Sequence, residues 1–304
     1  MIVAALDIGT QSTRLLVTDG ASDLTRRAVV TRLGAGAAAA GRLADEAAER
    51  TLAQLGAYRT ELEALGAVRV RAVATQAVRA AANGSEFLDA AEAALGVRPE
   101  LISGAEEGAL SFRGATAGLA AESGPFAVVD LGGGSCEFAV GAERCDAVFS
   151  APFGSLSLTE EFFSAADPPS PAELVSCLSV VELHLDDAAR ELPLLAEAAT
   201  FVGVAGTMCT LAAVEIGLAV YDRGVIDGFV LTKAAAEDVF RTLVTEPYED
   251  RLANPGLPPE RGRSILGGAC AVVGLMRRFG LAQLTIRDSD LLDGIAAGLL
   301  ESGG

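Results

Sequence analysis

Two short turns carry residue types that suit phosphate binding, and they look like copies of each other. Residues 7–10 read Asp-Ile-Gly-Thr, and residues 130–135 read Asp-Leu-Gly-Gly-Gly-Ser. Turns of Gly, Ser and Thr let backbone N–H groups and hydroxyls approach one anion closely, because no large side chain is in the way. The leading residues Asp7 and Asp130 suit a divalent cation that rides on the phosphate, since hard cations take oxygen ligands. The pair of turns therefore predicts two related lobes that close on a phosphorylated substrate.

The composition narrows the class of protein. At 304 residues with 51% hydrophobic content, the chain fits one large or two medium domains with a well-buried core. The net charge of −18 argues against nucleic acid as a partner, because such proteins usually carry a basic patch. The longest uncharged stretch, residues 198–214, is shorter than the roughly 20 apolar residues of a membrane helix. We therefore expect neither a nucleic-acid partner nor a membrane segment.

The rare residue types limit the chemistry and the compartment. The 5 cysteines are odd in number and never form a C-x-x-C pair, and residues 1–6 lack a basic signal-peptide region. These features predict a cytoplasmic protein with reduced thiols. The single His and the absence of Trp leave little room for zinc hydrolase or Ser-His-Asp chemistry. With one Lys in the chain, contacts to phosphate fall to Arg, which binds phosphate in a bidentate manner.

The apolar patterns predict an α/β protein that repeats a meander of strands followed by crossovers. In the first half, strands are expected at residues 2–6, 14–18, 26–33, 69–74 and 99–102, and helices at residues 45–65 and 105–119, with a short helix around Arg79. Residues 120–125 are small and flexible, and strands begin again at residue 126. We therefore expect an N-terminal lobe at residues 1–119 and a C-terminal lobe at 120–290. The apolar helix at 291–304 is expected to pack back on the first lobe.

Six stretches together resemble the exopolyphosphatase and guanosine pentaphosphate phosphatase (Ppx/GppA) family. They lie at residues 5–14, 74–79, 102–107, 129–137, 202–207 and 290–295. Their order and spacing cover nearly the whole chain, which makes the resemblance specific. It implies the two-lobed, ribonuclease H-like α/β fold of actin, Hsp70 and the sugar kinases, with a central cleft. Longer members of the family carry a further helical region that is not found here.

The resemblance also implies roles for individual residues. Glu107, expected on a helix that faces the cleft from the first lobe, would orient the attacking water as general base, and Glu137 would be a second catalytic carboxylate. The residues expected to hold Mg²⁺, or Mn²⁺, are Asp7, Asp130 and Glu137. The residues expected to bind phosphate are Gly9, Thr10, Ser12, Arg14, Arg79, Gly132, Gly133, Gly134, Ser135, Gly206 and Thr207.

Most of these residues have a purely structural alternative. Glu107 could favour the positive end of a helix dipole without touching substrate. Asp7 and Asp130 could be turn residues that hydrogen-bond to their own backbone. Arg79 could pair with surface acids, and Gly206 could serve tight strand–helix packing or contact a nucleotide.

Three positions depart from the usual family pattern. Gln11 stands where the family usually has Asn, Cys136 where Thr is common, and Gly108 where Ala is usual. An Asn or Thr that donates to phosphate would be missed here, so these positions bear on affinity. None of the departures removes a carboxylate.

The leading hypothesis is an exopolyphosphatase that releases orthophosphate from polyphosphate ends and, without the further helical region, favours short chains. The alternative is a phosphohydrolase that converts guanosine pentaphosphate to the tetraphosphate with the same residues. A phosphotransfer kinase and a non-catalytic sensor of polyphosphate or alarmone represent other classes. A homodimer is expected from the resemblance alone.

Overall fold

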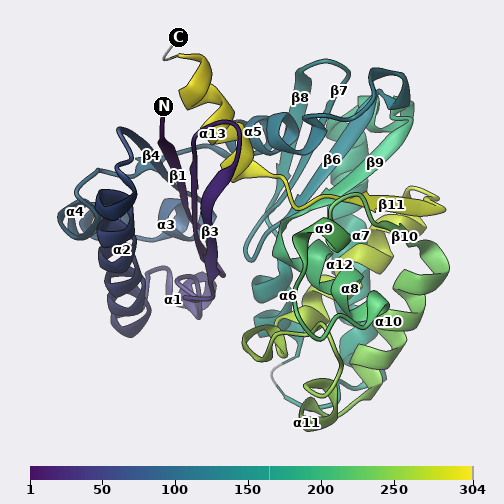
Figure 1. Cartoon of the computed structure of the whole chain (residues 1–304). Helices are drawn as coiled ribbons and strands as arrows, with labels where there is room; N and C mark the ends of the chain where they lie inside the picture. The colour runs from purple at the N-terminus through teal and green to yellow at the C-terminus, as the bar shows by residue number, and fades with distance from the viewer. Residues whose placement is uncertain (164, 303–304) are drawn as a thin grey trace.

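The computed structural model describes residues 1–163 and 165–302, and these form two lobes, each built around one mixed β-sheet (Figure 1). The two sheets share a plan. In each, a meander of three antiparallel strands is followed by parallel strands beside the first strand of the meander, and one further edge strand of the second sheet is antiparallel to its neighbour. The strand order is β3-β2-β1-β4-β5 in the first sheet and β10-β11-β9-β6-β7-β8 in the second.

The first sheet is centred on a strand that is buried along its whole length. Its strands are β1 (Val3–Ile8), β2 (Thr13–Thr18), β3 (Asp23–Val29), β4 (Arg69–Ala74) and β5 (Glu100–Leu101). One face of the sheet packs against α2 (Asp45–Leu65) and α4 (Gly84–Leu95), with Leu55, Tyr58 and Phe87 in the shared core. The short helices α1 (Ala37–Ala40) and α3 (Gln76–Ala80) contact each other.

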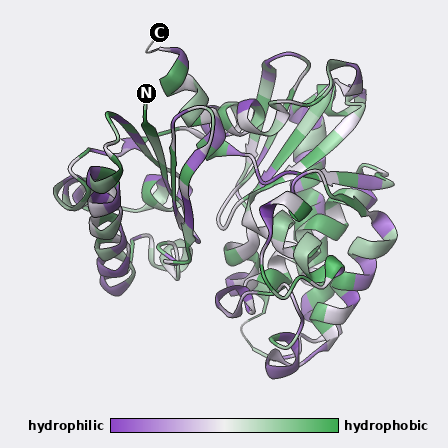
Figure 2. Cartoon of the chain, viewed as in Figure 1, coloured by the Kyte–Doolittle hydropathy of each residue, from purple (hydrophilic) through white to green (hydrophobic). Residues whose placement is uncertain are grey.

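The second sheet is larger and carries most of the helices. Its strands are β6 (Phe126–Leu131), β7 (Cys136–Gly141), β8 (Cys145–Ala151), β9 (Thr200–Val204), β10 (Val230–Thr232) and β11 (Gln283–Ile286). Its helices are α6 (Ser155–Phe162), α7 (Pro171–Glu191), α8 (Ala205–Ile216), α9 (Arg223–Ile226), α10 (Lys233–Thr245), α11 (Tyr248–Arg251) and α12 (Ile265–Arg278). Short 3₁₀ turns lie at Ala121–Ser123, Pro193–Glu197 and Pro259–Arg261. Figure 2 shows the strands of this sheet mainly apolar, while α2 on the outside of the first lobe carries many polar residues.

Two helices cross between the lobes. The helix expected at 105–119 in the first lobe is α5 (Gly104–Thr116), and it packs on β6, β7 and β8 of the second sheet. The reason is its apolar face, where Phe112 and Ala115 join the core of the second sheet with Val128 and Val202. Long-range packing of this kind cannot be read from the helix period alone.

The C-terminal helix makes the reciprocal crossing. α13 (Leu291–Glu301) packs on β1 and β2 of the first sheet through Leu291, Leu292 and Ile295 (Figure 1). Residues 303–304, the end of the range expected for this helix, lie outside the described residues. α5 and α13 touch each other at Gly114 and Gly294, where an added Cβ would meet a backbone carbonyl of the opposite helix. The lobes are thus joined where these two helices cross.

The local predictions hold where the pattern is long and fail at the sheet edge. The helix at 45–65 and the strand at 69–74 are confirmed at their predicted bounds. The strand predicted at 26–33 is present with other bounds, because β3 begins at Asp23 and ends at Val29. The chain leaves the sheet after Val29, since the Arg32 N–H donates to the carbonyl of Gln11 and Arg32 adopts a φ of 51°.

Candidate active site between the lobes

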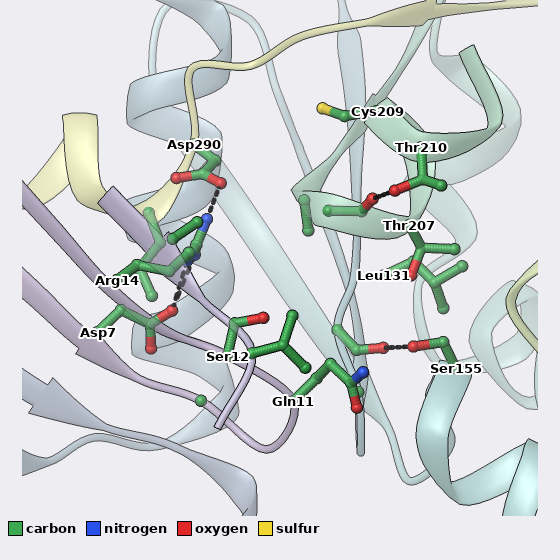
Figure 3. A pocket seen from close by; sticks show the side chains of 18 of the residues that line it. Asp7, Gln11, Ser12, Arg14, Leu131, Ser155, Thr207, Cys209, Thr210 and Asp290 are labelled. Atoms are coloured by element: carbon green, nitrogen blue, oxygen red, sulfur yellow. Dashed lines mark hydrogen bonds and ion pairs between the residues drawn. The ribbon is translucent and has the colours of Figure 1, made fainter. Parts of the chain in front are cut away.

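A cavity of about 860 Å³ lies between the lobes, and both turns line it (Figure 3). The predicted site residues that line it are Asp7, Gly9, Thr10, Ser12, Arg14, Glu107, Asp130, Gly132, Gly133, Gly134, Ser135, Gly206 and Thr207. Arg79 and Glu137 are not part of its lining. Sequence positions from residue 7 to residue 207 therefore meet at one place.

The two turns have the same backbone geometry. The Gly9 N–H donates to the Ser12 carbonyl at 3.0 Å, and the Gly132 N–H donates to the Ser135 carbonyl at 3.1 Å. Each turn joins two antiparallel strands, and in each the leading aspartate stands opposite the residue seven positions later: Asp7 faces Arg14, and Asp130 faces Glu137. The sequence repeat thus corresponds to a structural repeat, with a cation in one copy and a carboxylate in the other.

The turns also touch one another, and this contact requires glycine. A Cβ on Gly133 would lie 2.8 Å from Cβ of Gln11, and a Cβ on Gly134 would lie 2.9 Å from Oγ1 of Thr10. Both distances are below normal carbon contacts, so a side chain at either glycine would push the lobes apart. The first turn is also held to the second lobe by Gln11, whose amide donates to the Ser264 hydroxyl at 3.1 Å.

Arg14 is bound by two carboxylates rather than left free for substrate. Its guanidinium pairs with Asp7 at 2.9 Å and with Asp290, the N-cap of α13 (Figure 3). Burial opposes the charged form of Arg14, but the charges of Asp290 and Asp7 outweigh it and raise the arginine pKa. Burial also raises the pKa of Asp7, an effect that the Arg14 charge only partly offsets. Oδ1 of Asp7 is buried and has no hydrogen-bond partner among the described residues.

On the second lobe, Asp130 is fixed by a hydroxyl from α5. Ser111 donates to Oδ2 of Asp130, and both side chains are buried. Burial and the negative charge of Asp290 raise the pKa of Asp130 to about 6. Because α5 packs on β6, the helix that carries Ser111 holds this carboxylate in one orientation toward the cavity.

Glu107 and Glu137 form a second acidic pair beside the first. Ser103 caps α5 by accepting from the Glu106 N–H, which places Glu107 in the first turn. Burial, followed by the charges of Glu137 and Asp130, raises the pKa of Glu107 well above its ordinary value. Burial and Asp130 raise the pKa of Glu137 to about 8, although Ser150 donates to it at 2.7 Å. One carboxylate oxygen of each glutamate is buried without a hydrogen-bond partner in the described part of the chain.

Arg79 lies beside Glu107 and outside the cavity lining. Its Nη1 donates to the Ile102 carbonyl at 2.7 Å and lies 3.7 Å from Oε2 of Glu107. The arrangement places a positive charge next to the buried glutamate, where it favours the ionised form.

The acidic cluster fits a cation that shares its ligands with substrate. Carboxylate oxygens of Asp7, Glu107 and Glu137 are buried without a hydrogen-bond partner in the described residues, which leaves them free to contact a cation. Within residues 1–163 and 165–302, however, no group of three or more acidic, His or Cys side chains is close enough to hold a metal ion unaided. Mg²⁺ is commonly held by one or two carboxylates together with water and substrate phosphates, and that pattern suits this site.

Several residues at the site were not predicted. Asp290, Ser111 and Arg261 each contact site residues that are distant in the sequence. Arg261, for example, donates to the Ser12 hydroxyl at 3.3 Å and packs on Gly206. Asp290 lies within a stretch that carried the resemblance, and this was the available signal. For Ser111 and Arg261 the sequence offered none.

The departures from the family pattern have structural consequences here. Cys136 is buried in the core of the second sheet and does not line the cavity. Gly108 allows α5 to approach β8, because an added Cβ would lie 2.5 Å from Cγ1 of Val148.

Among the described residues, no helix has both the length and the hydrophobicity that a membrane span requires.

The fold and site together define a class: a two-lobed α/β protein with paired glycine-rich turns and buried carboxylates around one cleft. Residues 15–302 match the Ppx/GppA phosphatase family, and the chain belongs to that family.

Two kinds of relative support this assignment. The chain is 41% identical over 314 aligned residues to Exopolyphosphatase 2 of Mycobacterium tuberculosis, and 98% of each sequence is covered. Among solved structures, an exopolyphosphatase-like protein aligns with a TM-score of 0.95 at 32% identity over 100% of both chains. The Aquifex aeolicus PPX-GPPA enzyme aligns with a TM-score of 0.80 at 31% identity, covering 98% of this chain and 99% of that one.

Proposed function

We propose that the protein is an exopolyphosphatase, a hydrolase that releases orthophosphate from the ends of inorganic polyphosphate. The observation that carries the proposal is a cavity of about 860 Å³ lined by both turns, with Asp7, Glu107 and Asp130 on its wall. The family and the full-length relative named Exopolyphosphatase 2 support it. The guanosine pentaphosphate alternative is not favoured, because no feature of the cavity singles it out and the relative of matching length is an exopolyphosphatase.

Substrate binding would fall to the backbone of the two turns. Hydrolysis of a terminal anhydride requires neutralised charge, an oriented water and a group that takes its proton. Gly133 and Gly134 would present N–H groups on one side of the terminal phosphate and Thr10 on the other, whereas the N–H groups of Gly9 and Gly132 close their own turns. Their contact across the cleft would exclude bulk water from the reacting group.

Glu107 would act as the general base. The water oxygen would attack the terminal phosphorus, the bridging P–O bond would break, and the shortened chain would leave with its electron pair. The proton of the water would pass to the Glu107 carboxylate, whose raised pKa makes it a stronger base than an exposed glutamate. Arg79 would favour the ionised form of that carboxylate before the reaction, and Glu137 would share the same water.

Mg²⁺, or Mn²⁺, would neutralise charge on the phosphates when it is bound. Asp130, held by Ser111, and Asp7, held by Arg14, are the residues we propose to hold it, with Glu137 as a further oxygen ligand. Arg14 in this proposal positions Asp7 and does not bind phosphate, since its guanidinium nitrogens contact the carboxylates of Asp7 and Asp290.

A phosphate-release panel tests the proposal. The substrates are tripolyphosphate, longer polyphosphates of graded length, guanosine pentaphosphate and ATP, each with Mg²⁺ and with EDTA. We expect Mg²⁺-dependent release from polyphosphate, fastest with short chains. Release from guanosine pentaphosphate alone would replace the proposed substrate, and no release from any of them would overturn the proposed activity.

A further inference from the structure

The exposed part of the cavity wall carries an ion-pair cluster that no catalytic role accounts for. Asp23 and Arg26 on β3, Arg223 on α9 and Asp288 line the same cavity as the two turns. The side chains of Arg223 and Asp23 are 36% and 32% exposed, against 7% for Asp7. A phosphate chain held at its end by the buried turns would therefore leave the cavity past these residues.

The cluster links the two lobes through Arg223, whose contacts are each made to a different residue. Nη1 of Arg223 donates to Asp23 of the first lobe at 3.0 Å, and Nη2 donates to Ser289 at 2.9 Å. Asp288 and Asp293 lie 3.3 and 3.5 Å away, and Nε of Arg223 makes no hydrogen bond within the described chain. No carboxylate thus binds this guanidinium in the paired-edge geometry that Arg prefers for carboxylate and phosphate.

The neighbouring arginine differs in this respect. Both terminal nitrogens of Arg26 bind Asp293, at 3.1 and 2.5 Å, and Asp293 also accepts from the Asp290 N–H at the start of α13. Arg26 is therefore fixed. Arg223 can be taken over by a better ligand, because an exposed ion pair such as that with Asp23 contributes little, about 0–1 kcal/mol.

Charge explains why such a ligand would be a phosphate. A chain with a net charge of −18 repels polyanions over most of its surface, so extra phosphates need a local cation. We propose that Arg223 binds a phosphate distal to the scissile anhydride, and that Asp23 forms an ion pair with Arg223 when no long polyphosphate is bound. The inference rests on the proposed function, and it names the residue that would determine the response to chain length.

Kinetics on two substrates test the inference. Arg223→Gln should raise KM about fivefold for long polyphosphate, since one exposed charge-assisted contact is lost, with little change in kcat or in KM for tripolyphosphate. Asp23→Asn should lower KM for the long chain, because Arg223 then loses its ion pair with the first lobe. Arg241→Gln is the matched control, as Arg241 pairs with Asp238 on α10 and does not line the cavity. Equal effects on both substrates, or a KM raised by both variants, would show an ion pair that only holds the lobes together.

Direct binding separates this inference from the proposed activity. Calorimetric titration of long polyphosphate into the Glu107→Gln enzyme, with and without Arg223→Gln, needs no turnover. A fivefold weaker affinity with Arg223→Gln supports the subsite even if the wild-type enzyme releases no phosphate. Unchanged affinity, or no binding of polyphosphate at all, overturns it, and thermal unfolding confirms that each variant is folded.

Discussion

Replacing Glu107 by Gln gives the sharpest separation between chemistry and structure at this site. The residue is 8% exposed, and Oε2 has no hydrogen-bond partner in the described structure. A Gln side chain has nearly the same shape as Glu, but its amide cannot take a proton from the attacking water. Loss of a general base lowers the rate about 10²–10⁴-fold. This corresponds to roughly 3–5 kcal/mol in the activation barrier.

The pH dependence of the two enzymes gives an independent check on the same residue. Burial and the charges of Glu137 and Asp130 raise the pKa of Glu107, so the base is more fully ionised as the pH rises. Wild-type kcat/KM should therefore increase with pH until Glu107 is deprotonated. The Glu107→Gln enzyme should lack this limb, measured as phosphate release at saturating Mg²⁺.

The same substitution should leave the fold intact or make it more stable. Glu107 has a folded-state pKa above its unfolded value, so its contribution to stability is fully present at low pH and is lost as the pH rises through the folded pKa. At alkaline pH the wild-type protein ionises a buried carboxylate that the variant lacks. The variant should then have the higher Tm at alkaline pH and an equal Tm at acidic pH, in the absence of metal and substrate.

Glu106→Gln is the matched control, because Glu106 lies one residue away and is exposed, in an ion pair with Arg71. It should change neither kcat nor the pH profile. Normal phosphate release by Glu107→Gln would refute the assignment of the base. A loss of activity that is accompanied by a large fall in Tm would indicate a structural role instead.

Three other outcomes are expected. Gly114→Ala should lower the free energy of unfolding by about 1–3 kcal/mol or more, because the new Cβ meets the Asp290 carbonyl. Gly56→Ala in α2 is the control: its Cβ meets nothing within 4 Å, so it should raise the free energy of unfolding by up to about 1 kcal/mol. Denaturant unfolding measures both. Arg14→Gln should destabilise the protein by roughly 3–5 kcal/mol, since it leaves Asp7 and Asp290 as unpaired buried charges, and an unfolding free energy near wild type would contradict the pairing. Removal of divalent cations with EDTA should abolish phosphate release and be reversed by Mg²⁺, and activity that persists in EDTA would exclude the proposed cation.

The sequence predicted the features that depend on local patterns. The two turns could be found because an aspartate, glycines and a hydroxyl residue follow an apolar strand at each site. The helix at 45–65 and the strand at 69–74 have complete periodic patterns, and both are confirmed. The family is confirmed because its motifs are spread along the chain in a fixed order.

What the sequence could not provide depends on contacts between distant residues. The placement of α5 on the second sheet follows from the match of Phe112 to that sheet's core, which no local pattern reveals. Arg14 was predicted to bind phosphate, and only the structure shows that Asp290 and Asp7 both engage it. The roles of the site residues, the lobe boundary, the homodimer and the cytoplasmic location stay predictions.

The most direct test of the central claim is a crystal structure of the Glu107→Gln enzyme with tripolyphosphate and Mg²⁺. We expect the terminal phosphate in contact with both turns, with the N–H groups of Thr10, Gly133 and Gly134 within hydrogen-bond distance, and the cation on Asp130. A chain bound at another surface, or one that contacts only one of the turns, would contradict the account.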